Sequence, residues 1–278
     1  MKRVVDKEFW TRVFTSIGII ILSILFIWGS GNLQFTRFCT GVLNVFVVYE
    51  IFKATSSRDN EFWQVIMSVI GFILPFIKLP YYAIVLTIAF MVAVIVAICM
   101  MTNRQRFHFR STSPAIWFCI VINLFFVAIP NLRILENGLC YLIFPMLICI
   151  TTDVFAYLIG RKWGKTRLAP TVSPNKTVEG AAAGIIISYA FALLFAVVLN
   201  YFASVSIKWK FFSWYALLCS AVGQFGDLTA SVIKRIAGVK DFGTLLPGHG
   251  GILDRLDSHS FAFAFTYIFC SIGGMFLG

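Results

Sequence analysis

A polar stretch near the C-terminus carries most of the residues whose types and spacing could do chemistry. Asp227 lies within an otherwise apolar run, and Ser231 and Lys234 follow it at positions i+4 and i+7. On a helix, these spacings place a carboxylate, a hydroxyl and an ammonium on one face. Because an aspartate at the centre of a membrane helix costs roughly 2.5–3.5 kcal/mol, we expect a compensating partner or ligand.

Two further aspartates, Asp254 and Asp257, are three residues apart and would share one face of a helix. Two carboxylates about 4 Å apart repel by roughly 4 kcal/mol at an effective dielectric near 20, so converging carboxylates indicate a bound cation. Just before them, residues 247–251 read Pro-Gly-His-Gly-Gly, a loop whose backbone N–H groups can approach a phosphate. Carboxylates for a metal, with glycines and bases for phosphates, indicate phosphoryl chemistry.

Residues 231–257 resemble the defining motif of the CDP-diacylglycerol synthases, which are phosphatidate cytidylyltransferases. The matching positions are Ser231, Lys234, Arg235, Lys240, Asp241, Gly243, Leu246, Pro247, His249, Gly250, Gly251, Asp254, Arg255 and Asp257. A second block, similar to another recurring block of these enzymes, comprises Asp153, Ala156, Tyr157, Gly160, Arg161, Gly164, Lys165, Ser173, Pro174, Asn175, Lys176, Thr177, Glu179 and Gly180. The two blocks occur in the order expected for the family.

Considered without the resemblance, the second block has two interpretations. Residues 173–180 look like the start of a helix, with Ser173 or Thr177 as its cap. Unsatisfied N–H groups at a helix N-terminus beside Lys176 would form an anion site. Alternatively, these residues are only caps and topology signals. Asp153 and Tyr157, four residues apart, would share a helix face ending at the membrane border.

The resemblance implies an Mg²⁺ site at Asp227 and Asp254, with Asp257 close by, and a second, monovalent cation such as K⁺. It implies that catalysis depends on these three aspartates together with Lys234 and Arg235. The residues that it implies for binding CTP or the phosphatidate head group are Asp153, Tyr157, Ser173, Asn175, Lys176, Thr177, Glu179, Ser231, Lys240, Asp241, His249, Gly250, Gly251 and Arg255. The family fold is all-helical and often dimeric, so the resemblance also implies a homodimer.

The residues themselves leave other roles open for these charged side chains. The three aspartates could form structural ion pairs with Lys234, Arg235 and Arg255. Asp241 is either a metal ligand or a partner that orders its loop, and His249 is a metal ligand, a phosphate donor or a loop anchor. With no cysteine or second histidine in the motif, zinc is not expected. His108 and His259 are expected to be incidental.

The composition of the chain indicates which class of protein must position these residues. The chain has 278 residues, 59% of them hydrophobic and 13% charged, with a mean hydropathy of +0.88, which indicates an integral membrane protein. The net charge of +11 comes from bases in short loops between apolar runs, a topology pattern and not a nucleic-acid site. Seven cysteines lack a C-x-x-C spacing and are interpreted as small hydrophobes.

The predicted fold is an all-α integral membrane protein with about nine transmembrane helices. The predicted spans are residues 13–29, 33–52, 62–77, 82–101, 114–130, 138–160, 178–202, 212–235 and 261–278. The first span follows a basic segment and is expected to be an uncleaved anchor, because no clear cleavage site follows it. We divide the chain into N-terminal scaffold helices (1–137) and a C-terminal catalytic region with cytosolic motif loops (138–278).

The basic residues predict the orientation of these spans. One side carries Lys2, Arg3, Lys7, Arg12, Lys53, Arg58, Arg104, Arg106, Arg110, Arg161, Lys162, Lys165, Arg167, Lys176, Lys234, Arg235, Lys240 and Arg255. The other side carries only Lys78, Arg133, Lys208 and Lys210. By the positive-inside rule, the N-terminus and both motif loops are cytosolic and the C-terminus is outside.

Arg37 and Glu50 are the exceptional intramembrane charges of the first half. On a structural interpretation, they form an ion pair with each other or are polar groups at the ends of a helix. On a functional interpretation, they are part of a path for the lipid head group.

The resemblance implies a CTP:phosphatidate cytidylyltransferase of a bacterial plasma membrane, working in phospholipid biosynthesis on the cytosolic side. The phosphate of phosphatidate would attack the α-phosphate of CTP directly, with pyrophosphate leaving in line. The alternatives are a transporter or flippase, which lacks support because no inverted repeat is evident, and a CTP-using lipid kinase or related synthase. A kinase would release CDP instead of pyrophosphate.

Overall fold

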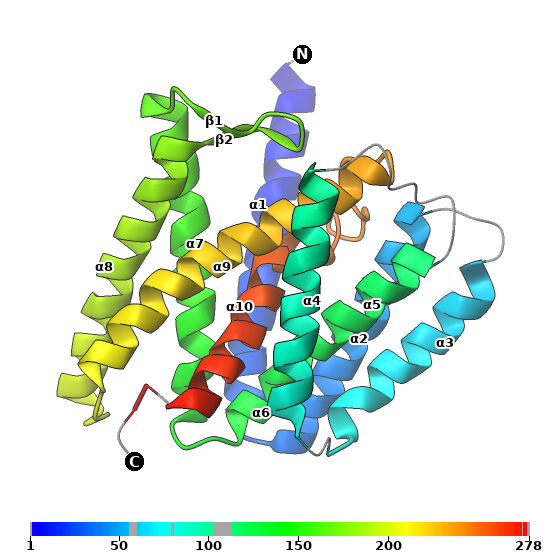
Figure 1. Ribbon diagram of the computed structural model, residues 1–278. Coiled ribbons are helices and arrows are strands. Elements are labelled where there is room, and N and C mark those ends of the chain that lie inside the picture. The colour runs from blue at the N-terminus through cyan, green and yellow to red at the C-terminus, as the bar shows by residue number, and fades with distance from the viewer. Residues whose placement is uncertain (1, 56–59, 79–80, 103–112, 274, 277–278) are drawn as a thin grey trace. The chain divides into compact units, whose positions relative to one another are not determined.

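The computed structural model describes residues 2–55, 60–78, 81–102, 113–273 and 275–276, and nearly all of its regular structure is helical (Figure 1). A short antiparallel pair of strands is the exception. The elements in chain order are α1 (Lys2–Gly29), α2 (Leu33–Thr55), α3 (Asn60–Ile73), η1 (Leu74–Phe76), α4 (Tyr82–Thr102), α5 (Ser113–Phe126), α6 (Ala128–Arg133), α7 (Gly138–Trp163), β1 (Arg167–Ala169), β2 (Ser173–Thr177), α8 (Val178–Phe202), α9 (Trp209–Ile236) and α10 (Leu253–Ile272).

Seven segments of the described chain are long and apolar enough to cross a membrane. They are Trp10–Gly29, Leu33–Thr55, Tyr82–Thr102, Ala115–Arg133, Gly138–Trp163, Val178–Phe202 and Trp209–Ile236. These segments correspond to seven of the predicted spans, so the prediction of a helical integral membrane protein is confirmed.

The two other predicted spans lie in helices that do not meet both conditions. Residues 62–77 overlap a shorter apolar helical segment, Glu61–Phe76, which is made up of most of α3 and of η1. Residues 261–278 overlap α10, which begins at Leu253 and carries three charged residues near its start. The count of nine spans and the orientation of the termini stay predictions.

The chain divides into two compact units. Unit 1 contains the described residues of Met1–Lys78, Gln105–Pro130 and Lys234–Leu256. Unit 2 contains those of Leu79–Arg104, Asn131–Ile233 and Asp257–Gly278. Three of the five unit boundaries therefore fall within helices, namely α6, α9 and α10, and unit 1 joins N-terminal helices to most of the C-terminal polar motif.

Unit 1 is built around α2, which packs against α3 and α5. The backbones of α2 and α3 approach closely at Gly41, where a Cβ atom would lie only 2.8 Å from the carbonyl oxygen of Phe72. The buried side chain of Asn44 donates from Nδ2 to the carbonyl oxygen of Gly71, 2.9 Å away. Apolar residues such as Ile51 on α2 fill the rest of this core.

Unit 2 is built around the antiparallel helices α7 and α8, which lie side by side (Figure 1). The face that α8 buries is a stripe of small residues at four-residue spacing: Gly180, Gly184, Ser188, Ala192 and Ala196. Small side chains let two helix backbones approach closely, which is the usual way in which membrane helices pack. The hydroxyl of Ser220 on α9 lies 2.7 Å from that of Thr152 and 3.0 Å from that of Ser188, which joins α9 to the pair.

A two-stranded hairpin leads into α8. Strand β1 pairs with β2, with Arg167 opposite Thr177. The helix begins at Val178, and the Thr177 hydroxyl oxygen accepts from the Gly180 N–H at 3.1 Å, which confirms Thr177 as the cap. Ser173 is not a cap, because it lies at the start of β2. The sequence did not predict β1 or β2, because each strand depends on pairing with the other and not on its own composition.

Candidate functional site

Asp227 lies on α9 within unit 2, where its carboxylate is partly exposed. It forms an ion pair with the Nζ atom of Lys176, which comes from β2. The Ser231 hydroxyl, one turn further along α9, donates to Oδ1 of Asp227 at 3.4 Å. The predicted neighbourhood of Asp227 and Ser231 is therefore present, and the hairpin contributes the cation that compensates the carboxylate.

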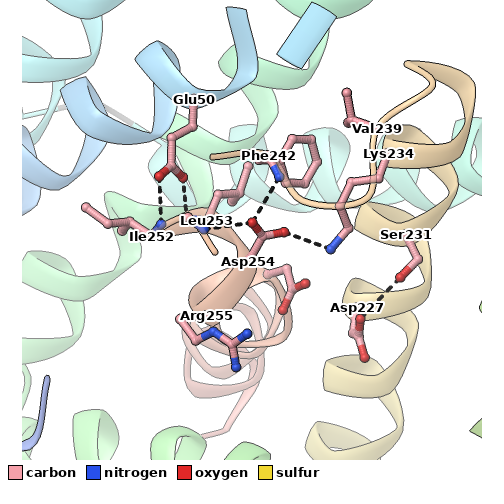
Figure 2. A network of polar contacts seen from close by, with 12 residues as sticks. Glu50, Asp227, Ser231, Lys234, Val239, Phe242, Ile252, Leu253, Asp254 and Arg255 are labelled. Carbon is pink, nitrogen blue, oxygen red and sulfur yellow. Dashed lines mark hydrogen bonds and ion pairs between the residues drawn. The ribbon is translucent and has the colours of Figure 1, made fainter. Parts of the chain in front are cut away.

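Asp254 lies in the first turn of α10 within unit 1, and its side chain is only 3% exposed. Its Oδ1 atom accepts from Nζ of Lys234 at 2.9 Å, while Oδ2 accepts from the backbone N–H groups of Phe242 and Gly251, both at 2.9 Å (Figure 2). Three donors, one of them charged, thus hold a single buried carboxylate. This network fixes the loop of residues 242–251 against the start of the helix.

Lys234 is held on a second side by an aromatic ring. Its Nζ atom lies 5.4 Å from the centre of the Phe242 ring, a distance at which a cation is attracted to the ring face. Phe242 is itself buried, and its ring stacks on Phe118 of α5. Nearby, Nη1 of Arg235 donates to the carbonyl oxygen of Val239 at 3.3 Å.

Glu50 of α2 caps the N-terminus of α10. Its side chain is fully buried, and its Oε1 and Oε2 atoms accept from the N–H groups of Ile252 and Leu253, each at 2.8 Å (Figure 2). A helix N-terminus exposes unsatisfied N–H groups and a partial positive charge, so a carboxylate is well suited to this place. The interpretation of Glu50 as a polar group at a helix end thus fits, although the helix end is that of α10.

The glycine-rich loop is a compact turn. The N–H groups of Leu246 and His249 donate to the carbonyl oxygens of Gly250 and Leu246, respectively. Gly248 and Gly250 have φ angles of 75° and 83°, which favour glycine. Nε of Arg255 donates to the His249 carbonyl oxygen at 2.9 Å, closing the turn onto α10.

Helix α1 also contacts this loop. The Thr15 hydroxyl donates to the carbonyl oxygen of Pro247 at 2.9 Å, and the Ser16 hydroxyl lies 3.2 Å from Nε2 of His249. Of the roles left open for His249, the contact with Ser16 fits that of a loop anchor. The N-terminal helix thus helps to hold the loop in place.

Other residues of the second block surround the hairpin. The carboxylate of Glu179 accepts from the N–H groups of Lys165 and Thr166, which ties α8 to the chain entering β1. The exposed Tyr157 accepts from Nη1 of Arg161 at 3.2 Å. The exposed Asn175 lies on β2.

The remaining predicted residues lie in several environments. Asp153 is exposed on α7, and Lys240 and Asp241 are exposed in the loop after α9. The buried Asp257 of α10 accepts at Oδ1 from the Ser258 N–H at 2.8 Å. His108 lies outside the described residues.

The residues that the sequence did not assign are Glu50, Thr15 and Ser16. Thr15 and Ser16 gave no signal, since hydroxyl residues are ordinary in apolar helices. Glu50 did give one, because an intramembrane acid calls for a partner, but its partners are backbone N–H groups, which leave no mark in a sequence.

Within the described residues, no group of three or more His, Cys, Asp or Glu side chains could hold a metal ion. Mg²⁺ does not need such a group, because it is usually bound by one or two carboxylates together with substrate phosphates and water. The oxygen donors of Asp227 and Asp254 fit that ion chemically.

The described residues define a helical integral membrane protein with two lysine–aspartate ion pairs. The chain belongs to the Cytidylyltransferase family, whose sequence profile matches residues 10–273. This membership confirms the resemblance carried by the two polar blocks.

Several curated relatives are similar to part of the chain. The phosphatidate cytidylyltransferase of Bacillus subtilis (strain 168) is 42% identical over 148 residues, which are 53% of this chain and 53% of the relative. Those of Staphylococcus saprophyticus subsp. saprophyticus and Staphylococcus aureus (strain COL) are 39% and 38% identical over 159 residues, covering 57% of this chain and 59% of each relative. The chain thus spans somewhat more than half the length of the curated relatives it matches.

Proposed function

We propose that this protein is a phosphatidate cytidylyltransferase, which converts CTP and phosphatidate to CDP-diacylglycerol and pyrophosphate. Membership of the Cytidylyltransferase family and the similarity to bacterial phosphatidate cytidylyltransferases support this proposal. The observation that carries it is that Asp227 and Asp254 each form an ion pair with a lysine of one of the two polar blocks, Lys176 and Lys234, respectively. Carboxylates and ammonium groups held together suit a reaction that handles phosphates and their counterions.

The proposed reaction is a direct in-line displacement. A non-bridging oxygen of the phosphatidate phosphate attacks the α-phosphorus of CTP, forming a new P–O bond. The bond from that phosphorus to the bridging α–β oxygen breaks, and pyrophosphate leaves with the electron pair. Because a phosphate dianion is already a competent nucleophile, the chain needs no dedicated general base.

Basic side chains would bind and orient the phosphates. Lys176 and Lys234 are the natural candidates, because each already holds its ammonium group beside a carboxylate. Arg235, Lys240 and Arg255 would add charge around them. Positioned cations of this kind neutralise charge that develops on the transferring phosphoryl group and on the leaving pyrophosphate.

Mg²⁺ is the proposed metal, held by Asp227 and Asp254 with Asp257 close by, and a monovalent cation such as K⁺ is proposed as a second ion. When bound, Mg²⁺ neutralises phosphate charge and orients the triphosphate. Asp254 already accepts from three donors, so we expect it to exchange its contact with Lys234 when the metal binds. Asp227, which is more exposed, is the more accessible ligand.

We also propose the location of the reaction. The distribution of bases supports a cytosolic location for the motif loops, on the side where nucleoside triphosphates are present. Bacterial relatives favour the plasma membrane. A homodimer is proposed on the family resemblance alone.

The test is product formation by purified protein in detergent micelles with CTP, phosphatidate and Mg²⁺. We expect pyrophosphate release that requires both substrates, together with CDP-diacylglycerol identified by mass spectrometry. Release of CDP with a phosphorylated lipid would instead indicate a kinase. Folded protein that forms no CDP-diacylglycerol would overturn the proposal, and lipid movement in liposomes without nucleotide would then favour a transporter.

A further inference from the structure

Glu50 is an unusual cap, because it comes from a different helix than the one it caps. Caps normally come from the residue just before the helix. Here α2 supplies a fully buried carboxylate to N–H groups that lie 202 and 203 residues further along the chain. Burying a carboxylate in an apolar helix is costly unless strong donors accompany it, so this contact has a role beyond filling space.

The loop backbone is shaped around this carboxylate. A Cβ atom at Gly251 would lie 2.5 Å from both Glu50 oxygens, and one at Gly243 would lie 2.6 Å from Oε1. No alanine fits at either position without moving the carboxylate or the loop. These two glycines are therefore explained by close approach to Glu50 and not by a left-handed backbone.

Glu50 and Asp254 share one set of consecutive backbone donors. Asp254 accepts from the N–H of Gly251, and Glu50 accepts from those of Ile252 and Leu253. Asp254 follows directly after Leu253, so the two carboxylates hold the turn from opposite ends of the same short segment. Fixing these N–H groups fixes the backbone from which the Asp254 side chain projects.

We propose that Glu50 is a positioning residue for the nucleotidyl transfer. It acts through the N-terminus of α10, where it sets the place of Asp254 and of the glycine-rich loop, and it touches neither substrate nor metal. This inference rests on the proposed function for its catalytic part. It also assigns to an N-terminal helix a direct role in building the motif.

The test compares Glu50→Gln with Asn44→Ala as a matched control. Both residues are buried on α2 in unit 1, but Asn44 bonds to Gly71 of α3 and not to the loop. The first readout is hydrogen exchange of the backbone amides in residues 251–256, measured by mass spectrometry on the full chain in micelles. The second is kcat and KM for CTP.

We expect Glu50→Gln to speed exchange in this segment about tenfold and to lower kcat about tenfold, because one of the two accepting oxygens becomes an NH2 group, which faces a backbone N–H donor without accepting from it. The KM for CTP should change less than kcat, since Glu50 does not contact the nucleotide. Asn44→Ala should leave exchange in residues 251–256 unchanged.

A second variant covers the case in which Glu50→Gln does not fold. Gly243→Ala keeps the carboxylate but places a methyl group against it. Like Glu50→Gln, it should therefore speed the hydrogen exchange of residues 251–256 and lower kcat. Unchanged exchange in both variants would overturn the positioning role whether or not the protein makes CDP-diacylglycerol. Raised exchange with unchanged kcat would also overturn it, whereas an inactive wild type with raised exchange in the variants would count against the proposed function alone.

Discussion

Asp254 in unit 1 and Asp227 in unit 2 are both proposed to bind Mg²⁺, but they are held differently. Asp254 is 3% exposed and accepts from one ammonium and two backbone N–H groups. Asp227 is 23% exposed, and its described partners are the side chains of Lys176 and Ser231. Asp254 is thus part of the framework that shapes its loop, whereas Asp227 is held by side chains that can exchange.

Because the two aspartates are held differently, removing each should affect stability and activity to different degrees. Removing a buried carboxylate leaves its donors without partners, which costs stability as well as chemistry. Removing a partly exposed one costs little stability, because water can solvate what remains. Paired measurements of activity and unfolding should therefore distinguish the two aspartates.

The largest effect is expected for Asp254→Asn. Activity should be lost, and the free energy of unfolding should fall by about 3 kcal/mol or more, because Lys234 becomes a buried charge without its counterion. The measurement is CDP-diacylglycerol formation alongside thermal unfolding in detergent. A variant as stable as the wild type would remove the distinction drawn between the two sites.

Asp227→Asn should lose activity about a hundredfold while unfolding changes by less than about 1 kcal/mol. The same two assays apply, run side by side with Asp254→Asn. Asp227→Glu is the matched control, since it keeps the charge and displaces it by one methylene. A large drop in the unfolding temperature of Asp227→Asn would mean that this aspartate is also structural.

Lys176→Met should raise the KM for CTP about tenfold, because a charged hydrogen-bond donor to phosphate is removed from β2. Lys176→Arg, which keeps the charge, should restore most of the binding. Steady-state kinetics with varied CTP measures both. If instead only the KM for phosphatidate rose, Lys176 would belong to the lipid side of the site.

The smallest effect is expected for Thr177→Ala. Loss of the hydroxyl that caps α8 should lower the stability by about 1 kcal/mol, and Thr177→Ser should recover it. Thermal unfolding of the two variants is sufficient. Equal unfolding of the alanine and serine variants, both below the wild type, would show that the lost methyl group and not the cap is responsible.

Local signals in the sequence predicted the helices well. Helix α8 begins and ends at the predicted residues, Val178 and Phe202, because a polar string gives way abruptly to a long apolar run. The helical start of α10 at Leu253 agrees with the spacing of Asp254 and Asp257. Thr177 was one of the two caps predicted, with Ser173, because a cap of this kind is the residue just before its helix.

Long-range partners could not be predicted in the same way. The pairing of Lys176 with Asp227 joins a strand to a helix 51 residues away, and several other bases were equally plausible by charge. The donors to Glu50 are backbone N–H groups, which every residue except proline possesses. A sequence therefore shows that a buried acid needs a partner without showing which segment provides it.

The cap formed by Glu50 has a consequence for the synthesis of the protein. The chain emerges from the ribosome N-terminus first, so α2 is made about 200 residues before the N–H groups that its carboxylate will accept from. During that interval the acid must remain solvated, protonated or bound by a temporary neighbour, because the bilayer core offers no donors. Assembly of unit 1 is thus completed only when Ile252 and Leu253 have been translated, and a chain arrested before Ile252 would leave the Glu50 carboxylate without these donors.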